Sequence, residues 1–240
     1  MASHIRIQQL EKSNKKLNSR LKRKITGEKQ QFLLKVLIGT KIYYKLLENG
    51  GIVLDDDGCV VEFRIQTGVS ASEFQLSYNL RRELTFDMEK IKSLSNLTKI
   101  DLNGTRVTGN IAHLESLRKL SVIKLTGKRV TGNIAYLKLL PNLTKIDLSS
   151  TGVTGNIAYL KSLPKLTVIH LGKTGVTGDI AHLKSLLKLT VIHLGKTGVT
   201  GDIAHLKSLL KLTVIDLVET GVSGDKEAFE ASRKWSICCL

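Results

Sequence analysis

Apolar residues return at a fixed interval of 23 residues along most of the chain. A leucine opens each interval, at Leu97, Leu120, Leu143, Leu166, Leu189 and Leu212. A glycine keeps the same spacing, at Gly109, Gly132, Gly155, Gly178, Gly201 and Gly224. Two successive units, residues 166–188 and 189–211, are identical. A period of this length predicts an array of stacked structural repeats rather than one globular core.

Each unit reads L-x-x-I-x-L-x-x-T-x-V-T-G-[ND]-I-A-x-L-x-x-L-x-x. Its first six residues alternate apolar and polar, which predicts a short strand with one buried face. We interpret the Val-Thr-Gly-Asn/Asp-Ile segment that follows as a turn, in which glycine adopts backbone angles closed to other residues. The final Leu-x-x-Leu segment has the spacing of an α-helix or a 3-10 helix. One unit cannot bury both faces alone, so neighbouring units must stack.

These motifs closely resemble the leucine-rich-repeat family over residues 97–224, and more loosely from residue 74. The Val-Thr-Gly-Asn-Ile-Ala segment is similar to the plant-specific signature L-x-G-x-I-P, with alanine in place of proline and units one residue shorter. The family's inward asparagine is replaced by Thr105, Thr151, Thr174, Thr197 and Thr220, and Lys128 interrupts the series. A threonine hydroxyl can still bond backbone groups of the turn. The resemblance implies an α/β fold, a right-handed solenoid with a curved parallel sheet on the concave side and short helical or 3-10 segments on the convex side.

The ends of the array need covers, because a solenoid otherwise exposes its last apolar layer. Residues 74–96 match the repeat as a degenerate first unit, so the array spans 74–224. Before it, residues 29–73 are expected to form an N-terminal cap, made of a helix over 29–48 and a β-hairpin around Asp55-Asp-Asp-Gly58. After it, residues 225–240 are expected to form a capping helix, near 225–236, and a tail; in that helix Phe229 and Trp235 would cover the final layer.

Residues 1–28 form a basic amphipathic arm. Apolar residues and one asparagine alternate at spacings of three and four over residues 5–24, the pattern of a short coiled coil and of a weak homodimer contact. Its cations include Lys12, Lys15, Lys16, Arg20, Lys22, Arg23 and Lys24. Three interpretations stay open: an arm that docks on a larger partner, a solvated tail, or an organelle-targeting segment, against which the lysine content argues.

The chain carries a formal charge of +16, and its array alone holds 17 Lys and Arg against 8 Asp and Glu over residues 97–225. This excess favours nucleic acid, an anionic membrane surface or an acidic protein as partner, although lysines on a solvated surface explain it equally well. Three cysteines cannot form a disulfide framework, so a reducing, intracellular and cytoplasmic setting is expected. No apolar run is long enough for a transmembrane helix.

Outward residues of stacked strands form ladders across the inner wall, and all of those named below except Val122 are the predicted partner-binding residues. The position between the two buried aliphatic residues of each strand reads Asp101, Lys124, Asp147, His170, His193 and Asp216. The position two residues earlier begins Lys99, Val122 and Lys145, and ends in a valine stripe, Val168, Val191 and Val214. Lys173 and Lys196 line the inner edge. The stripe predicts a contact surface, although valine also simply favours strands.

Chemistry beyond binding finds little support in the sequence. A metal site at His170 and His193 is disfavoured, because a flat wall gives ligands no convergence. The Gly-Lys-Thr at 172–174 lacks the glycine loop of a phosphate site, and no nucleophile motif occurs, so no enzyme activity and no cofactor are expected. Exposed aromatic residues that read bases are missing, which leaves only nonspecific phosphate contact to nucleic acid.

Two functions fit the sequence. The first is a non-catalytic scaffold that binds a protein partner through the concave face of the solenoid. The second is a structural subunit of a larger ribonucleoprotein or membrane-associated complex, anchored by the basic arm.

Overall fold

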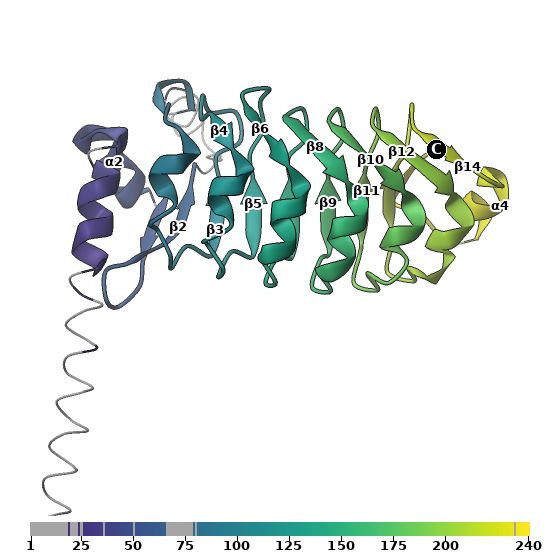
Figure 1. The fold of residues 1–240 in the computed structure, drawn as a ribbon, viewed down its shortest axis with the longest axis horizontal. Coiled ribbons are helices and arrows are strands. Elements are labelled where there is room, and N and C mark those ends of the chain that lie inside the picture. Colours follow the sequence, from purple (N-terminus) through teal and green to yellow (C-terminus); the bar gives the residue numbers. More distant parts are fainter. Residues whose placement is uncertain are drawn as a thin grey trace, which may run out of the picture.

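The structure, a computed structural model, describes residues 19, 24, 26–35, 37–49, 51–65, 79, 81–232 and 234–240. The repeats stack side by side into a curved solenoid, with the N-terminal helices at one end and the C-terminal helix at the other (Figure 1). Buried leucine, isoleucine and valine side chains form one continuous core along its length. The 23-residue register predicted from the sequence therefore sets the architecture.

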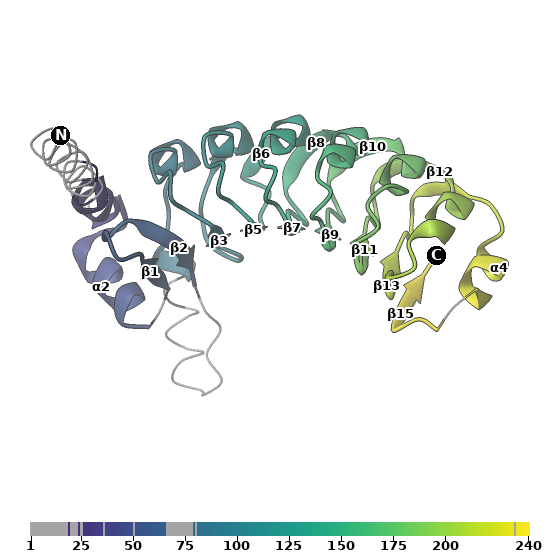
Figure 2. The same ribbon diagram turned by 90° about the horizontal axis from the view of Figure 1, so that it is seen from below.

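Within the described residues, nine strands form one sheet in the order β1-β2-β3-β5-β7-β9-β11-β13-β15. It lies on the concave side of the curve, as Figure 2 shows. Its repeat strands pair parallel and exactly one unit apart, so that Ile100 lies beside Ile123 and Ile146 beside Ile169. The bounds of these strands are β3 Lys99–Asp101, β5 Val122–Lys124, β7 Lys145–Asp147, β9 Val168–His170, β11 Val191–His193 and β13 Val214–Asp216.

A second, six-stranded sheet runs through the segment that the sequence predicted as a turn. Its described strands are β4 Gly109–Asn110, β6 Val130–Asn133, β8 Gly152–Asn156, β10 Gly175–Asp179, β12 Gly198–Asp202 and β14 Gly221–Ser223. The turn prediction was wrong in this respect, because each short segment gains its hydrogen bonds from the same segment of the next repeat. The glycine part of the prediction is confirmed: Gly155 has a φ of 113°.

Short 3-10 helices cover the convex side. They are η1 Met88–Ile91, η2 Ile111–Leu114, η3 Ile134–Leu139, η4 Ile157–Ser162, η5 Ile180–Leu183 and η6 Ile203–Ser208. Each begins after an Asn or Asp whose side chain accepts a hydrogen bond from the amide two residues later, as Asn133 does from Ala135 at 2.8 Å. This capping explains the Asn/Asp position of the repeat.

The threonine series lies inside the solenoid and bonds turn backbone, which confirms its predicted role. Thr151 is 5% exposed, and its hydroxyl donates to the Leu148 carbonyl at 2.6 Å. Thr174 and Thr197 make the same 2.6 Å bond to Leu171 and Leu194. A buried carbonyl at each turn is thereby satisfied.

Between residues 26 and 49, the described chain forms two helical segments rather than one continuous helix. Residues 26–35 and 37–38 are helical, and α2, Thr40–Glu48, follows after Gly39, whose φ is 83°. The predicted single helix over 29–48 is therefore wrong, because a residue in the left-handed region interrupts a helix. β1 (Ile52–Leu54) and β2 (Val60–Arg64) form an antiparallel hairpin, and β2 extends the concave sheet by pairing with β3.

Several predictions concern residues outside the described part of the chain. Of the arm, only residues 19, 24 and 26–28 are described, so the coiled coil, the homodimer contact and the cations from Lys12 to Arg23 lie outside it. Residues 74–78 and 80 of the predicted first repeat lie outside it as well. No helix among the residues that are described is long and apolar enough to span a bilayer.

The C-terminal segment folds differently from the predicted helix over 225–236. Helix α4 covers only Lys226–Ala231, with Asp225 as its N-cap, and β15 (Ile237–Cys239) then pairs parallel with β13. Phe229 is fully buried, and the Trp235 ring lies 5.2 Å from its ring. The shorter helix lets the tail return to the concave sheet and add a ninth strand to it.

Candidate functional site

The predicted partner-binding residues lie together on the concave face. Eleven of them lie on β3, β5, β7, β9, β11 and β13, and the parallel register places each beside its equivalent in the next repeat. Lys173 and Lys196 lie just beyond β9 and β11, at the carboxyl edge of the sheet. The ladders expected from the 23-residue period are present in three dimensions.

The first half of this face is polar and internally paired. The Lys99 ammonium lies 2.6 Å from a carboxylate oxygen of Glu62, and the Lys124 ammonium lies 3.1 Å from one of Asp101. Charges of opposite sign on adjacent strands neutralise one another here. The N-terminal half of the wall therefore offers few unpaired cations to a partner.

The second half carries a half-exposed apolar row. Val168, Val191 and Val214 pair in register on adjacent strands. The row continues into Ile237, which pairs with Val214 and is 51% exposed. Sequence reasoning missed Ile237, because no strand was expected in the tail after the predicted helix over 225–236, and only the fold brings this residue to the sheet. We call these four residues the apolar stripe.

A histidine pair lies beside the apolar stripe. The rings of His170 and His193 lie 4.5 Å apart, edge to face, and His193 Nδ1 lies 3.7 Å from a carboxylate oxygen of Asp216. The His170 Nε2 atom is buried and has no hydrogen-bond partner among the described residues. Burial, and then the neighbouring His193, lower the pKa of His170. His170 is therefore held in its neutral form near neutral pH.

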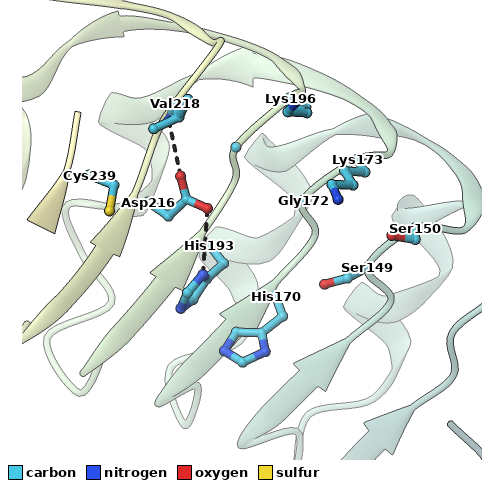
Figure 3. Close-up of a pocket in the computed structure, with 11 residues that line it drawn as sticks. Ser149, Ser150, His170, Gly172, Lys173, His193, Lys196, Asp216, Val218 and Cys239 are labelled. Carbon is cyan, nitrogen blue, oxygen red and sulfur yellow. Dashed lines mark hydrogen bonds and ion pairs between the residues drawn. The ribbon is translucent and has the colours of Figure 1, made fainter. Parts of the chain in front are cut away.

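The histidines border a hollow of about 490 Å³ at the carboxyl edge of the sheet (Figure 3). Its floor is made by Gly172 and Gly195, at a ladder position where other repeats carry Asn103, Thr126, Ser149 or Val218. The hollow exists because these two repeats have no side chain there. In the sequence, the hollow corresponds to two glycines in a ladder of larger residues, a pattern that did not enter the prediction of the site.

Two lysines form the outer rim of the hollow. Lys173 and Lys196 have φ values of 58° and 60°, left-handed conformations shared by Ser150 and Glu219 in the flanking repeats. The Lys196 ammonium lies 2.8 Å from a carboxylate oxygen of Glu219, and this hydrogen bond raises the pKa of Lys196. Lys173 has no ion pair with any described residue, so its charge is available at the rim.

Metal binding and redox chemistry have no organised site in the described chain. No group of three or more His, Cys, Asp or Glu side chains there is arranged to hold a metal ion. No disulfide joins the three cysteines, all of which the structure describes, and burial is the main cause that raises the pKa of Cys59 and of Cys238. A raised thiol pKa disfavours the reactive thiolate.

A second surface lies along the edge where each 3-10 helix leads to the next concave strand. We call it the lysine edge; its exposed members are Lys138, Lys161, Lys165, Lys184, Lys188 and Lys211. None of these six is paired with a carboxylate of a described residue. Leu187 and Leu210 lie among them, 59% and 84% exposed. The edge thus combines cations with exposed apolar tips.

The sequence matches no protein-family model and no curated protein at a significant level. The fold matches many solved structures. One is the plant peptide hormone receptor RGFR1 in complex with RGF2, at 26% identity and a TM-score of 0.53 over 63% of this chain and 25% of that one. Another is the Arabidopsis receptor kinase HAESA ectodomain in complex with an N-terminally extended IDA peptide hormone. Its sequence identity is 18%, and its TM-score is 0.61 over 79% of this chain and 35% of that one.

The internalin C2 of Listeria monocytogenes is similar over almost the whole of both chains, 88% of this one and 92% of that one, at 20% identity and a TM-score of 0.52. The chain spans only about a quarter of the RGFR1 structure and about a third of the HAESA structure. These likenesses agree with the repeat pattern in showing one fold, and they leave the plant-specific subclass a prediction.

Proposed function

Because the chain is a leucine-rich-repeat protein, we propose that it is a non-catalytic scaffold that binds a protein partner through the concave face of its solenoid. The observation that carries this proposal is the apolar stripe, in which Val168, Val191 and Val214 are partly exposed and Ile237 is 51% exposed, on a sheet held rigid by the buried core. Exposed apolar rows rimmed by polar groups are typical of contact surfaces.

The similar structures support the kind of partner. The two plant receptors were solved with peptide ligands bound. An extended segment of a protein fits the curved wall for a physical reason: apolar side chains of the segment cover the stripe, while its polar groups meet the ladders on either side. The proposed partner is therefore a protein that presents an extended segment.

The test replaces Val168, Val191 and Val214 together with glutamate. We expect partner capture from native extract to fall at least tenfold, because three carboxylates would be desolvated at the contact. Chemical cross-linking should place the captured protein on β9, β11 and β13. A matched control replaces Thr154, Thr177 and Thr200 with glutamate; these exposed residues lie on β8, β10 and β12. Equal capture by both variants would move the site off the concave wall.

The second candidate function is a structural subunit of a larger ribonucleoprotein or membrane-associated assembly, anchored by the basic arm. The observation that favours its membrane form is the lysine edge, where cations surround Leu187 and Leu210. Lysines attract anionic headgroups, and exposed leucines enter the boundary with the acyl chains, whereas nucleic acid offers those leucines no apolar partner.

Vesicle sedimentation tests this second function. We expect the chain to sediment with phosphatidylserine vesicles at low salt and to be released at high salt. Replacement of Leu187 and Leu210 with aspartate should weaken binding several-fold, while Thr177→Asp with Thr200→Asp changes the charge equally on the other side and should not. Deletion of residues 1–28 measures how much the basic arm contributes to vesicle binding. Binding that survives both the leucine change and the deletion would exclude this mode of anchoring.

We propose an intracellular, reducing setting, supported by the three described cysteines, which form no disulfide. Selective labelling of the thiols in intact cells, followed by mass spectrometry, tests it. Recovery of a disulfide at Cys59, Cys238 or Cys239 would contradict the proposal.

A further inference from the structure

The aspartates of the inner ladder each cap a backbone amide of their own repeat. An Asp147 carboxylate oxygen accepts a hydrogen bond from the Ser149 amide at 3.2 Å. Asp216 accepts in the same way from Val218 at 3.1 Å. Asp101 repeats the contact at 3.4 Å. Three repeats thus use a carboxylate to satisfy the amide that follows the concave strand.

Three repeats lack this carboxylate, because Lys124, His170 and His193 occupy the position. Of these, the two histidine repeats also have glycine two residues later, at Gly172 and Gly195. The backbone geometry is otherwise unchanged: the Ser150 amide donates to the Gly172 carbonyl, and the Lys173 amide donates to the Gly195 carbonyl, both at 2.9 Å. The Gly172 amide therefore faces the place that corresponds to the Asp147 carboxylate. Neither the Gly172 amide nor the Gly195 amide has an acceptor among the residues that the structure describes.

The space for a replacement acceptor is the hollow itself (Figure 3). Over Gly195 this space is already occupied, because a Cβ added there would lie 2.7 Å from an Asp216 carboxylate oxygen. Over Gly172 the nearest atom to an added Cβ is the Gly195 carbonyl oxygen, at 3.2 Å. The Asp216 side chain is held by His193 and by the Val218 amide, so the half of the hollow over Gly172 holds no carboxylate and is bordered by the Gly195 carbonyl oxygen. We call it the open half.

The Gly195 carbonyl oxygen at the border of this open half already accepts a hydrogen bond from the Lys173 amide, at 2.9 Å, and the other lining groups include hydrogen-bond donors. Ser149 and Lys173 line it together with the Gly172 amide, and the Lys173 charge is unpaired within the described chain. His170 adds a buried Nε2 atom without a partner. The neighbouring cation, Lys196, is partly neutralised because its ammonium is paired with Glu219. A cationic rim and a free amide favour an anion of the size of a carboxylate.

We propose that the hollow over Gly172 binds a carboxylate of the protein partner, supplied by an Asp or Glu side chain, in the place that the Asp147 carboxylate holds one repeat earlier. This inference rests on the proposed function and deepens it. Val168 lies on the same strand as His170, two residues before it, so the partner segment presents an apolar residue to the stripe and an acidic one to the hollow.

The experiment uses the full ¹⁵N-labelled chain and small probes, so that no partner is needed. N-acetyl-glutamate amide carries only a side-chain carboxylate, and N-acetyl-glutamine amide is its neutral isostere. We expect the glutamate probe to shift the Gly172 and Lys173 amide signals saturably, and the glutamine probe to leave them in place. N-acetyl-glycine, whose carboxylate is that of a chain end, tells which source of carboxylate binds more tightly. Tighter binding of the glutamate probe supports a side-chain carboxylate, and tighter binding of N-acetyl-glycine would contradict that source.

The matched variant is His170→Asp, which places in this repeat the residue that Asp147 supplies in the repeat before. Its own carboxylate should cap Gly172 and weaken the glutamate probe at least tenfold. His182→Asp makes the same substitution on the convex side, in η5, and should leave the affinity unchanged. Equal shifts from the glutamate and glutamine probes, or full affinity in His170→Asp, would overturn the proposal.

Failure here is distinguishable from failure of the scaffold function. The glutamate substitutions in the stripe test partner capture without reference to the hollow, and the probe titration tests the hollow without a partner. If His170→Asp loses the probe but retains partner capture, the hollow binds carboxylate and the partner does not use it, which contradicts the deepened proposal. If both are lost together, the acidic residue of the partner enters the hollow.

Discussion

The residue between the two buried aliphatic side chains of each concave strand decides much of the chemistry of the concave wall. Where it holds aspartate, as at Asp147, the side chain caps the next amide and closes the edge of the sheet. Where it holds histidine, as at His170, the amide is left free and the edge opens into a hollow. The fold tolerates both, because the strand backbone is hydrogen-bonded to its neighbours in either case.

His170 also makes stability depend on pH. Burial and the neighbouring His193 lower its pKa, while Asp147 raises it and Lys124 lowers it further. Protons therefore bind the unfolded chain more readily than the folded one. The stability that neutral His170 contributes is present above the ordinary histidine pKa and is lost as the pH falls through the lowered value.

We expect the free energy of unfolding of the native chain to decrease from about pH 7.5 to about pH 5, across the ordinary histidine range. His170→Gln, which does not titrate, should lose less stability over the same interval. Urea denaturation at the two pH values measures the difference, and His182→Gln is the control. An equal pH dependence in His170→Gln and the native chain would show that His170 does not cause the loss of stability between these pH values.

At the scale of the element, the second sheet and the 3-10 helices depend on each other. Gly155, the second-last residue of β8, has a φ of 113°, and a Cβ added there would clash with the Asn133 side chain. Asn133 is in turn the N-cap of η3. One repeat's glycine is thus required by the capping residue of the repeat before it.

Gly155→Ala should therefore lower the free energy of unfolding by about 1–3 kcal/mol, from the left-handed φ and the close contact. Asn133→Ala removes the contact and also the cap, at a cost of about 1 kcal/mol. In the double variant we expect the free energy of unfolding to fall by less than the sum of the two single losses. The alanine side chain at position 133 is too short to clash with the Cβ at position 155. Strictly additive losses in urea denaturation would show that Asn133 and Gly155 do not interact.

At the scale of the whole molecule, a solenoid is stabilised mainly between neighbouring repeats. Phe229 covers the last repeat and is fully buried beside Trp235. β15 covers the end of the concave sheet by pairing with β13. The final repeat is therefore held by a segment that follows the array rather than by another copy of the unit.

Phe229→Ala should cost about 3–5 kcal/mol at the C-terminal end. Because coupling runs between neighbours, amide hydrogen exchange should accelerate strongly in β13 and little in β5. Ala228→Gly, next to Phe229 on the exposed face of α4, is the control for helix propensity. Equal acceleration in β5 and β13 would mean that the array unfolds as one cooperative unit.

The fold was largely predictable, and the candidate site only in part. The leucines at the start of each unit predicted the register, and the register predicted which residues share the concave face. Ile237 was not predicted as part of the sheet, because a three-residue apolar tail forms a strand only where a sheet edge such as β13 is available to it. Gly172 and Gly195 were visible in the sequence, but a missing side chain becomes a hollow only between filled neighbours.

By itself, the sequence determined the repeat, its buried face and the ladders, because these depend on a local period that every unit carries. Only the tertiary structure decided the second sheet, the ninth strand of the concave sheet and the hollow beside His170. Each of these arises from a contact between units or between the array and its end. A backbone segment such as Gly152–Asn156 becomes a strand when its equivalents lie on both sides of it, and the Gly172 amide is left free when the carboxylate of its own repeat is absent.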